Sequence, residues 1–218
     1  MVERMLVVGA SGYVGRRVVA EAIRRGAAVA ALSRSGKPNC LRQDDTLHQA
    51  TWLRADATQA KTLTPHLDKI DAVVSALGTF GSNATMRAVN GDANAALAAA
   101  AAAAGARRFV HVSAADYGPL EKLLPGYFEG KRIADAAVAE HFGERGTSLR
   151  PGFIHGTRAV ALPLVGGEVR LPLWLAGAPM EYLFSSAAGR AARSALGSLG
   201  GVLTPPVSVD AVATAAVD

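Results

Sequence analysis

The amino-acid sequence predicts an α/β fold in which helices cover both faces of a doubly wound parallel sheet. Short apolar runs alternate with longer stretches of helical character from residue 5 to residue 150. Such runs are typical of strands buried on both faces, and their alternation with helices favours parallel strands. At 218 residues, 50% of them hydrophobic, the chain can bury one sizeable core and has little room for a second full domain.

The first strand, turn and helix follow one another within 25 residues. The apolar run 5–8 is short and partly β-branched, and Gly9 ends it, as expected of a buried strand. A helix is predicted from about 12 to 25, with apolar residues on one face and Gly26 as its C-terminal stop. The run 28–32 then reads as the second strand, which completes a βαβ unit.

The later elements continue this alternation up to residue 150. We expect strands at 52–55, 72–76, 109–112 and 147–150, and helices at 92–106 and 128–145. The first of these helices is almost pure alanine, which has the highest helix propensity and permits close packing on a sheet. Beyond Gly156, glycine and proline interrupt every pattern and predict a short irregular C-terminal region. We therefore expect a single domain, 1–218, in which 153–218 is a reduced extension on the substrate side.

Composition and charge exclude several classes of protein. The net charge of +5 comes from basic residues scattered along the chain, and with 6% aromatic residues there is no basic, aromatic-rich face for nucleic acid. The lone Cys40 excludes an intrachain disulfide and is expected to be a surface thiol, and no His, Cys or carboxylate cluster has metal-ligand spacing. Because charges, glycines and prolines interrupt the most apolar region, 160–184, we expect a soluble or peripheral protein. The first strand begins within about four residues of the N-terminus, so we expect no targeting peptide in this sequence; if the protein is imported into an organelle, we expect the peptide to have been removed from it.

The loop between the first strand and the first helix is the strongest candidate for a binding site. Gly9, Gly12 and Gly15 have the spacing G-x-x-G-x-x-G, and Ser11, Tyr13 and Val14 complete the loop. Glycines allow a tight turn and let a diphosphate approach the helix N-terminus, where unpaired N–H groups and the helix dipole favour an anion. In a βαβ context this predicts a dinucleotide site of the Rossmann type. The alternative is a Rossmann fold that has lost its nucleotide.

The end of the second strand bears on which dinucleotide is bound. An NAD site usually carries an acidic residue here for the ribose 2′-OH, whereas this chain has Ser33 and Arg34, followed by Ser35 and Lys37. These residues offer donors and positive charge to a 2′-phosphate. We therefore expect NADP(H) to be preferred, with NAD(H) possible. The alternative is that Arg34 is an ordinary exposed arginine.

Two weaker signals follow the third and fourth strands. Asp56 and Ala57 are expected beside the adenine, and Ala76, Leu77 and Gly78 beside the ribose on the nicotinamide side. Each pattern is equally compatible with an ordinary turn. Their positions after consecutive strands nevertheless place them at the same edge of the sheet.

A candidate catalytic group comprises Ser113, Tyr127 and Lys131. The tyrosine and the lysine are four residues apart and so share a helix face, while Ser113 ends the strand 109–112. A lysine ammonium near a phenol is expected to lower the phenol pKa and to anchor the cofactor ribose, and the serine hydroxyl would hold the substrate oxygen. This chemistry suits carbonyl reduction or alcohol oxidation with a nicotinamide. The alternative is an arrangement that no longer turns over substrate.

Two other features favour structural roles. His111 alternates with valines inside a strand, which indicates a satisfied core histidine rather than a catalytic one. The apolar stretch 171–184 is expected to form a pocket wall or a packing surface rather than a membrane anchor.

Six segments together carry a family resemblance that extends over most of the chain. They are GASGYVG at 9–15, SRSGKP at 33–38, AD at 55–56, RRFVHVSA at 107–114, PGYFEGKRIAD at 125–135 and RPGFIHG at 150–156. On these segments the chain resembles the short-chain dehydrogenase/reductase superfamily, specifically its atypical branch. It is similar to a subgroup that includes a mitochondrial accessory protein of coenzyme Q biosynthesis, a plastid relative and, more distantly, the Rossmann accessory subunit of respiratory complex I.

The resemblance implies NADP(H) bound on the glycine loop and Arg34, with Tyr127 and Lys131 also touching the cofactor and Pro151, Gly152 and Phe153 at its nicotinamide end. It implies either of two functions. One is an NADP(H)-dependent oxidoreductase for a hydrophobic carbonyl or quinone-like substrate. The other is a non-catalytic nucleotide-binding accessory subunit, peripheral to a membrane complex of a mitochondrion or chloroplast. A regulator that senses the NADP(H) ratio is a third reading.

Overall fold

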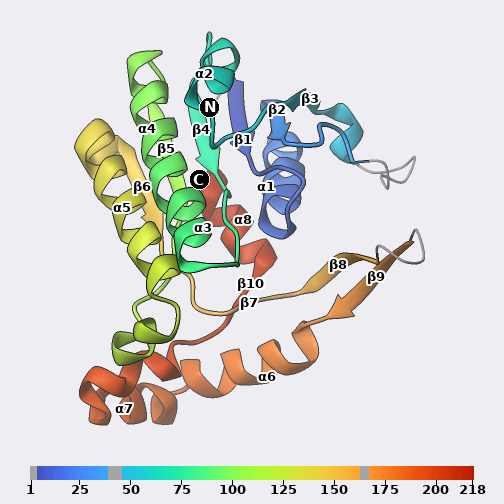
Figure 1. Ribbon diagram of the computed structural model, residues 1–218. Helices are drawn as coiled ribbons and strands as arrows, with labels where there is room; N and C mark the ends of the chain where they lie inside the picture. The colour runs from blue at the N-terminus through green and yellow to red at the C-terminus, as the bar shows by residue number, and fades with distance from the viewer. Residues whose placement is uncertain (1–3, 39–45, 163–166) are drawn as a thin grey trace.

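The computed structural model describes residues 4–38, 46–162 and 167–218, and it confirms the predicted fold class (Figure 1). Six parallel strands form the central sheet, with helices on both of its faces. These strands are β1 Arg4–Val8, β2 Ala28–Ser33, β3 Thr51–Arg54, β4 Ala72–Ser75, β5 Arg108–Val112 and β6 Gly146–Leu149. Each lies within about two residues of its predicted position, because buried runs of apolar residues bounded by turns leave little ambiguity.

The strand order is β3-β2-β1-β4-β5-β6. Strands β2 and β3 therefore lie on one side of β1, and β4, β5 and β6 lie on the other, so the strand order switches between β1 and β4. In parallel register, Val8 at the end of β1 pairs with Leu32 of β2 and with Ser75 of β4. The loops that follow these three strands therefore meet at one edge. In open α/β sheets this switch point is where ligands bind.

Helices cover the sheet in two layers. Helix α1 (Tyr13–Arg24) packs with α8 (Val209–Val217) on one face, while α4 (Ala93–Ala103) packs with α5 (Pro125–Phe142) on the other (Figure 1). On the α1 side Val7 and Val18 are fully buried, and on the α4 side Leu6 and Leu97 are. Burial of this kind stabilises the fold by about 25 cal/mol per Å² of apolar surface.

The helical run that leads into α4 begins earlier than the predicted residue 92. It comprises α3 (Asn83–Arg87), a π-helical turn η3 (Ala88–Asp92) and then α4. The Ser82 hydroxyl caps α3 by accepting a hydrogen bond from the Thr85 N–H at 3.1 Å. The sequence did not predict α3 and η3 because the Asn-Gly pair inside η3 has low helix propensity.

Helix α5 spans 125–142, whereas the sequence predicted 128–145. Pro125 occupies the first turn, where a missing N–H is harmless, and Gly143 ends the helix at φ +54°. Two glycines let α5 approach the preceding helical run closely. A Cβ on Gly126 would lie 2.2 Å from the Asn83 carbonyl oxygen, and one on Gly91 would lie 2.9 Å from the Gly130 Cα.

The C-terminal region contains more regular structure than predicted. Strand β7 (Ile154–His155) pairs with β10 (Val207–Ser208), and β8 (Thr157–Leu162) pairs with β9 (Gly167–Pro172). Helix α6 (Trp174–Ser185) packs on β7 and β10, and α7 (Ala187–Ala195) follows it. These elements are short and broken by glycine and proline, which explains why no periodicity revealed them. The remaining elements are α2 Ala60–Leu63 and the short helices η1 Thr46–Gln49, η2 Thr64–His66, η4 Gly118–Leu123, η5 Gly143–Arg145 and η6 Gly197–Leu203.

Over the described ranges, none of the helices combines the length and the apolar character needed to cross a bilayer.

Candidate nucleotide-binding site

The glycine loop is folded so tightly that two of its positions exclude any side chain. Gly9 has φ +79°, and a Cβ there would lie 2.8 Å from the Ala76 carbonyl oxygen. A Cβ on Gly15 would lie 2.2 Å from the Gly9 carbonyl oxygen. Gly12 is the exposed N-cap of α1, with no side-chain cap and no acidic residue in the first turn of the helix. The amides of that first turn have no acceptor within the helix, so the loop presents them to an anion.

A cleft of about 150 Å³ lies at the switch point, between the ends of β1, β2, β3 and β4. Nine of the residues predicted to bind the cofactor line it: Gly9, Ser11, Gly12, Ser33, Arg34, Ala57, Ala76, Leu77 and Gly78. Val8, Leu32 and Ala55 also line it. Sequence reasoning missed these three because the apolar end of a buried strand looks the same whether or not it borders a ligand.

These residues fit a dinucleotide. A diphosphate suits the side-chain-free loop at the N-terminus of α1, where the dipole favours negative charge. The apolar surfaces of Leu32, Ala55 and Ala57 suit a base, and the exposed Arg34 borders the same cleft.

The Ser33 and Asp56 side chains serve local turns. The Ser33 hydroxyl is buried and donates to the Gly36 carbonyl at 2.7 Å, so it fixes the turn rather than offering its proton to a phosphate as expected. The Asp56 carboxylate accepts from the N–H and hydroxyl of Thr58, at 3.0 and 2.8 Å. These bonds lower the pKa of Asp56, and the Arg34 charge lowers it further, so the guanidinium lies within electrostatic reach of this carboxylate.

Tyr13 and Val14 direct their side chains away from the loop. A Cβ on Gly156 would lie 2.7 Å from the Tyr13 hydroxyl oxygen, which places the phenol against the C-terminal region. Val14 packs on the core formed by α1 and β1. Their predicted role in cofactor binding therefore rests on the backbone.

Two buried asparagines, which the sequence reasoning missed, hold the loop after β4. Asn90 accepts from the Thr79 N–H at 2.8 Å and donates to the Thr79 carbonyl at 3.1 Å. Asn94 accepts from the Ser75 hydroxyl at 2.5 Å and donates to the Leu77 carbonyl at 3.4 Å. Asn90 lies in the π-helical turn, and such turns often mark functional sites. The low helix propensity of Asn-Gly inside a helical stretch was the signal that could have found it.

Lys131 lies next to Gly78 of the cleft lining and binds the residue that precedes Ser113. The buried Lys131 ammonium donates to the Val112 carbonyl at 2.7 Å, one residue before Ser113. Its Nζ would lie 3.7 Å from a Cβ on Gly78. The Ser113 hydroxyl oxygen is buried and has no hydrogen-bond partner among the described residues. A buried hydroxyl left without a partner is costly unless a ligand completes it.

Tyr127 lies beside Lys131, with 6.0 Å between its ring centroid and the Lys131 Nζ. Its ring stacks on Phe80 at a centroid distance of 5.1 Å. Burial raises the pKa of Tyr127, and the nearby Tyr117 phenol raises it further, so the expectation of a lowered phenol pKa is wrong. The reason is that the lysine ammonium turns to the Val112 carbonyl. Burial lowers the pKa of Lys131 itself to about 8, partly offset by the charge of Asp135.

His111 is a core residue, as predicted, but it is not a satisfied one. It is fully buried, and burial holds its pKa well below the ordinary value, with the charge of Lys131 acting in the same direction. Neither ring nitrogen has a hydrogen-bond partner within the described ranges, and the nearest carboxylate, on Asp135, is 3.9 Å away. The imidazole is therefore neutral and does not take part in the candidate site.

The segment 151–153 is held by the loop after β5 and by the C-terminal region. Pro151 accepts from the Ala115 N–H at 2.8 Å, and Phe153 accepts from the Val207 N–H at 2.9 Å. A Cβ on Gly152 would lie 2.7 Å from the Pro205 carbonyl oxygen. The close approach at Gly152 is thus made to the protein's own backbone. Contact of this segment with the nicotinamide end remains a prediction.

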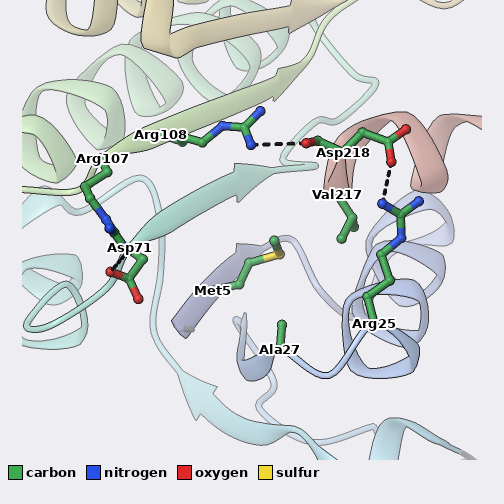
Figure 2. A pocket seen from close by; sticks show the side chains of 8 residues that line it. All are labelled: Met5, Arg25, Ala27, Asp71, Arg107, Arg108, Val217 and Asp218. Carbon is green, nitrogen blue, oxygen red and sulfur yellow. Dashed lines mark hydrogen bonds and ion pairs between the residues drawn. The ribbon is translucent and has the colours of Figure 1, made fainter. Parts of the chain in front are cut away.

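A second hollow, of about 410 Å³, lies at the opposite edge of the sheet and is less suited to an anion (Figure 2). Three arginines line it, but each already has a partner. Arg107 pairs with Asp71, Arg108 donates to the Asp218 carbonyl at 3.1 Å, and Arg25 pairs with the Asp218 carboxylate.

Two other predictions have different outcomes. Cys40 lies outside the described residues. The stretch 171–184 was expected to form a pocket wall or packing surface, yet Leu175, Met180, Tyr182 and Leu183 are exposed. These side chains project from α6, which packs on β7 and β10 through other positions.

Comparison with known proteins supports the interpretation of the cleft as a dinucleotide-binding site. Residues 9–168 match the NAD(P)H-binding family. An uncharacterised chloroplastic protein of Arabidopsis thaliana, At1g32220, is 37% identical over 99% of this chain and 71% of its own length. The photosystem II assembly factor Ycf39 of Synechocystis is 36% identical over 52% of this chain and 35% of its own length. MIOREX complex component 2 of Saccharomyces cerevisiae is 30% identical over 38% of this chain and 31% of its own length. The chain therefore spans about a third of these last two relatives.

Solved structures share the fold. The Bordetella bronchiseptica enzyme WbmG, in complex with NAD, has a TM-score of 0.59 at 18% identity, over 75% of this chain and 57% of WbmG. UDP-glucose 4-epimerase of Thermotoga maritima has a TM-score of 0.59 at 16% identity, over 71% of this chain and 57% of the epimerase. The family match and the Arabidopsis relative agree with the glycine loop found at the switch point. The chain therefore belongs to the NAD(P)H-binding family, with a Rossmann fold of the short-chain dehydrogenase/reductase and epimerase type.

Proposed function

We propose that the chain is an NADP(H)-dependent reductase of a hydrophobic carbonyl or quinone-like substrate, with residues 153–218 forming its substrate side. The observation that carries the proposal is the continuity of the lining: Gly78 borders the nucleotide cleft and also lies next to the Lys131 ammonium. A bound nicotinamide would supply the hydride. NADP(H) is preferred because Arg34 is the charged side chain of the cleft.

Each residue of the candidate catalytic group has a role in this scheme. The buried, unpartnered Ser113 hydroxyl would donate to the substrate oxygen. Tyr127, whose raised pKa keeps it protonated at neutral pH, would deliver a proton to that oxygen. A protonated phenol is the form that donates a proton in carbonyl reduction. Lys131, whose ammonium lies next to Gly78, would bind the cofactor ribose.

Replacing Tyr127 by phenylalanine should remove turnover and leave nucleotide binding intact. The variant keeps the ring that stacks on Phe80 and loses only the hydroxyl group. A positioned general acid typically contributes at least about 100-fold, so NADPH oxidation with a panel of quinones and carbonyls should fall by that factor. Equal turnover by the variant and the wild type would remove Tyr127 from the scheme.

Replacing Arg34 by alanine should weaken NADPH binding by about tenfold or more and change NADH binding little. A guanidinium bonded to a 2′-phosphate is worth roughly 1.5–3 kcal/mol, and NADH lacks that phosphate. Arg54 is a matched control because it is also exposed and lies beside the same turn at Gly36. Calorimetric titration of both variants with both nucleotides measures the effect. If Arg34→Ala lost affinity for the two nucleotides equally, the NADP(H) preference would be wrong.

A second candidate function is supported by the names of two relatives. Ycf39 is a photosystem II assembly factor and the yeast relative is a component of a complex. By this alternative, the chain is a nucleotide-holding accessory subunit in an organelle, peripheral to a membrane, and the Arabidopsis relative is chloroplastic. Bound nucleotide, no turnover with any acceptor and co-purification with other subunits would favour it over the reductase.

A further inference from the structure

Helix α6 has its polar and apolar faces reversed relative to an ordinary surface helix. Its one carboxylate, Glu181, is partly exposed and pairs with the buried His155 of β7, at 2.6 Å between carboxylate and imidazole nitrogen. Gly177, one turn earlier, faces the same histidine, because a Cβ there would lie 2.2 Å from the His155 Cβ. The side of α6 that packs on the protein therefore contains its charge.

The opposite side of α6 is apolar and open to solvent. Leu175, Met180, Tyr182 and Leu183 have 60%, 42%, 84% and 58% of their surface exposed, and at 100° per residue they fall on one side of the helix. Pro179, also exposed, lies among them. Grouped exposed apolar side chains of this size mark an interaction surface.

Basic residues adjoin this face. Arg190 of α7 donates to the Ser185 carbonyl, so its guanidinium lies at the C-terminal end of α6. Arg190 and Arg193 line a hollow of about 650 Å³ together with Asp116, one of whose oxygens accepts from the Gly118 N–H at 2.7 Å. From 173 to 206 the sequence contains Arg190 and Arg193 but a single acidic residue, Glu181, which pairs with His155.

We propose that the exposed side of α6, with Arg190 and Arg193, is a docking surface for an anionic phospholipid bilayer. An apolar face with an aromatic residue, flanked by arginines, is suited to the boundary between headgroups and acyl chains. The arginines would bind the headgroup phosphates while the leucines enter the acyl region. The inference rests on the second candidate function, an accessory subunit peripheral to a membrane, and names the surface that would carry that association.

Vesicle co-sedimentation of the full chain tests the surface. The wild type should sediment with vesicles of phosphatidylcholine and phosphatidylglycerol, and much less with phosphatidylcholine alone. Because each basic residue near such a surface adds about 1 kcal/mol, Arg190→Gln with Arg193→Gln should weaken binding by about tenfold or more. Arg54→Gln with Arg145→Gln removes the same charge from exposed arginines elsewhere and should have little effect.

A second pair of variants tests the apolar face. Leu175→Ser with Leu183→Ser should weaken binding by at least about tenfold, whereas Leu175→Phe with Leu183→Phe should keep it. Circular dichroism melts establish that each variant is folded. The inference is overturned if the folded wild type ignores both kinds of vesicle, or if the serine variant binds as the wild type does. It is also overturned if the face instead joins two copies of the chain, seen as a dimer that the serine variant abolishes.

NADPH titration of the same preparations separates the two proposals. If the protein binds NADPH but no vesicle, only the docking surface is refuted. If it binds vesicles but no nucleotide, the proposed reductase is refuted.

Discussion

Replacing Gly12 by aspartate should abolish dinucleotide binding while the protein remains folded. Gly12 is exposed and has φ −73° and ψ 174°, which any residue adopts, and a Cβ there meets only the Gly9 carbonyl oxygen, at 3.1 Å. Aspartate is also a good N-cap, so α1 should not be weakened. Its carboxylate would accept from the amides expected to bind the diphosphate and would repel that anion. We expect NADPH affinity to fall at least about 100-fold.

Gly12→Asn is the matched control, because asparagine has the same shape and no charge. It should lose less affinity than Gly12→Asp, and the difference between the two measures the repulsion. Gly15 is a poorer target, since its Cβ would lie 2.2 Å from the Gly9 carbonyl oxygen and would disturb the loop itself. If folded Gly12→Asp bound NADPH as tightly as the wild type, the dinucleotide could not lie on this loop.

Replacing Lys131 by methionine should stabilise the protein at neutral pH. Burial lowers the pKa of Lys131 from 10.5 to about 8, so between these values the unfolded chain binds more protons than the folded one. The wild type should therefore become more stable as pH rises through this window, and below it the buried charge costs about 3 kcal/mol. Methionine removes this cost but leaves the Val112 carbonyl without its donor, a loss of about 1 kcal/mol. The net expectation is a variant more stable by about 2 kcal/mol at pH 7.

Urea unfolding from pH 7 to pH 10.5 measures this difference. The advantage of Lys131→Met should shrink as pH rises and should reverse near pH 10.5, where only the lost hydrogen bond remains. Lys122→Met, at an exposed position, should show no such pH-dependent difference. A difference between Lys131→Met and wild type that did not vary with pH would mean that Asp135 fully compensates the buried ammonium.

The sequence predicted the fold and most of the residues that line the cleft, for a physical reason. Buried strands must be apolar, and a diphosphate at a helix N-terminus requires positions without side chains, so both leave patterns that are local in sequence. Gly9, Gly12 and Gly15 are such a pattern, and the structure places them where the fold requires. Short apolar runs that alternate with helical stretches also predicted the six central strands.

The features that the sequence did not reveal depend on packing between distant segments. Asn90 holds the loop after β4 by bonding to Thr79, and the neighbouring Gly91 contacts Gly130 of α5. The direction of the Lys131 ammonium depends on the Val112 carbonyl, so a spacing of four residues could not establish the phenol pKa. The reversed faces of α6 depend on where His155 lies.

Calorimetric titration of the purified wild-type chain with NADPH and NADH tests the central claim most directly. We expect saturable binding of one dinucleotide per chain, tighter for NADPH. A folded protein that retained neither nucleotide at about millimolar concentration, equivalent to a binding free energy weaker than roughly −4 kcal/mol, would contradict it.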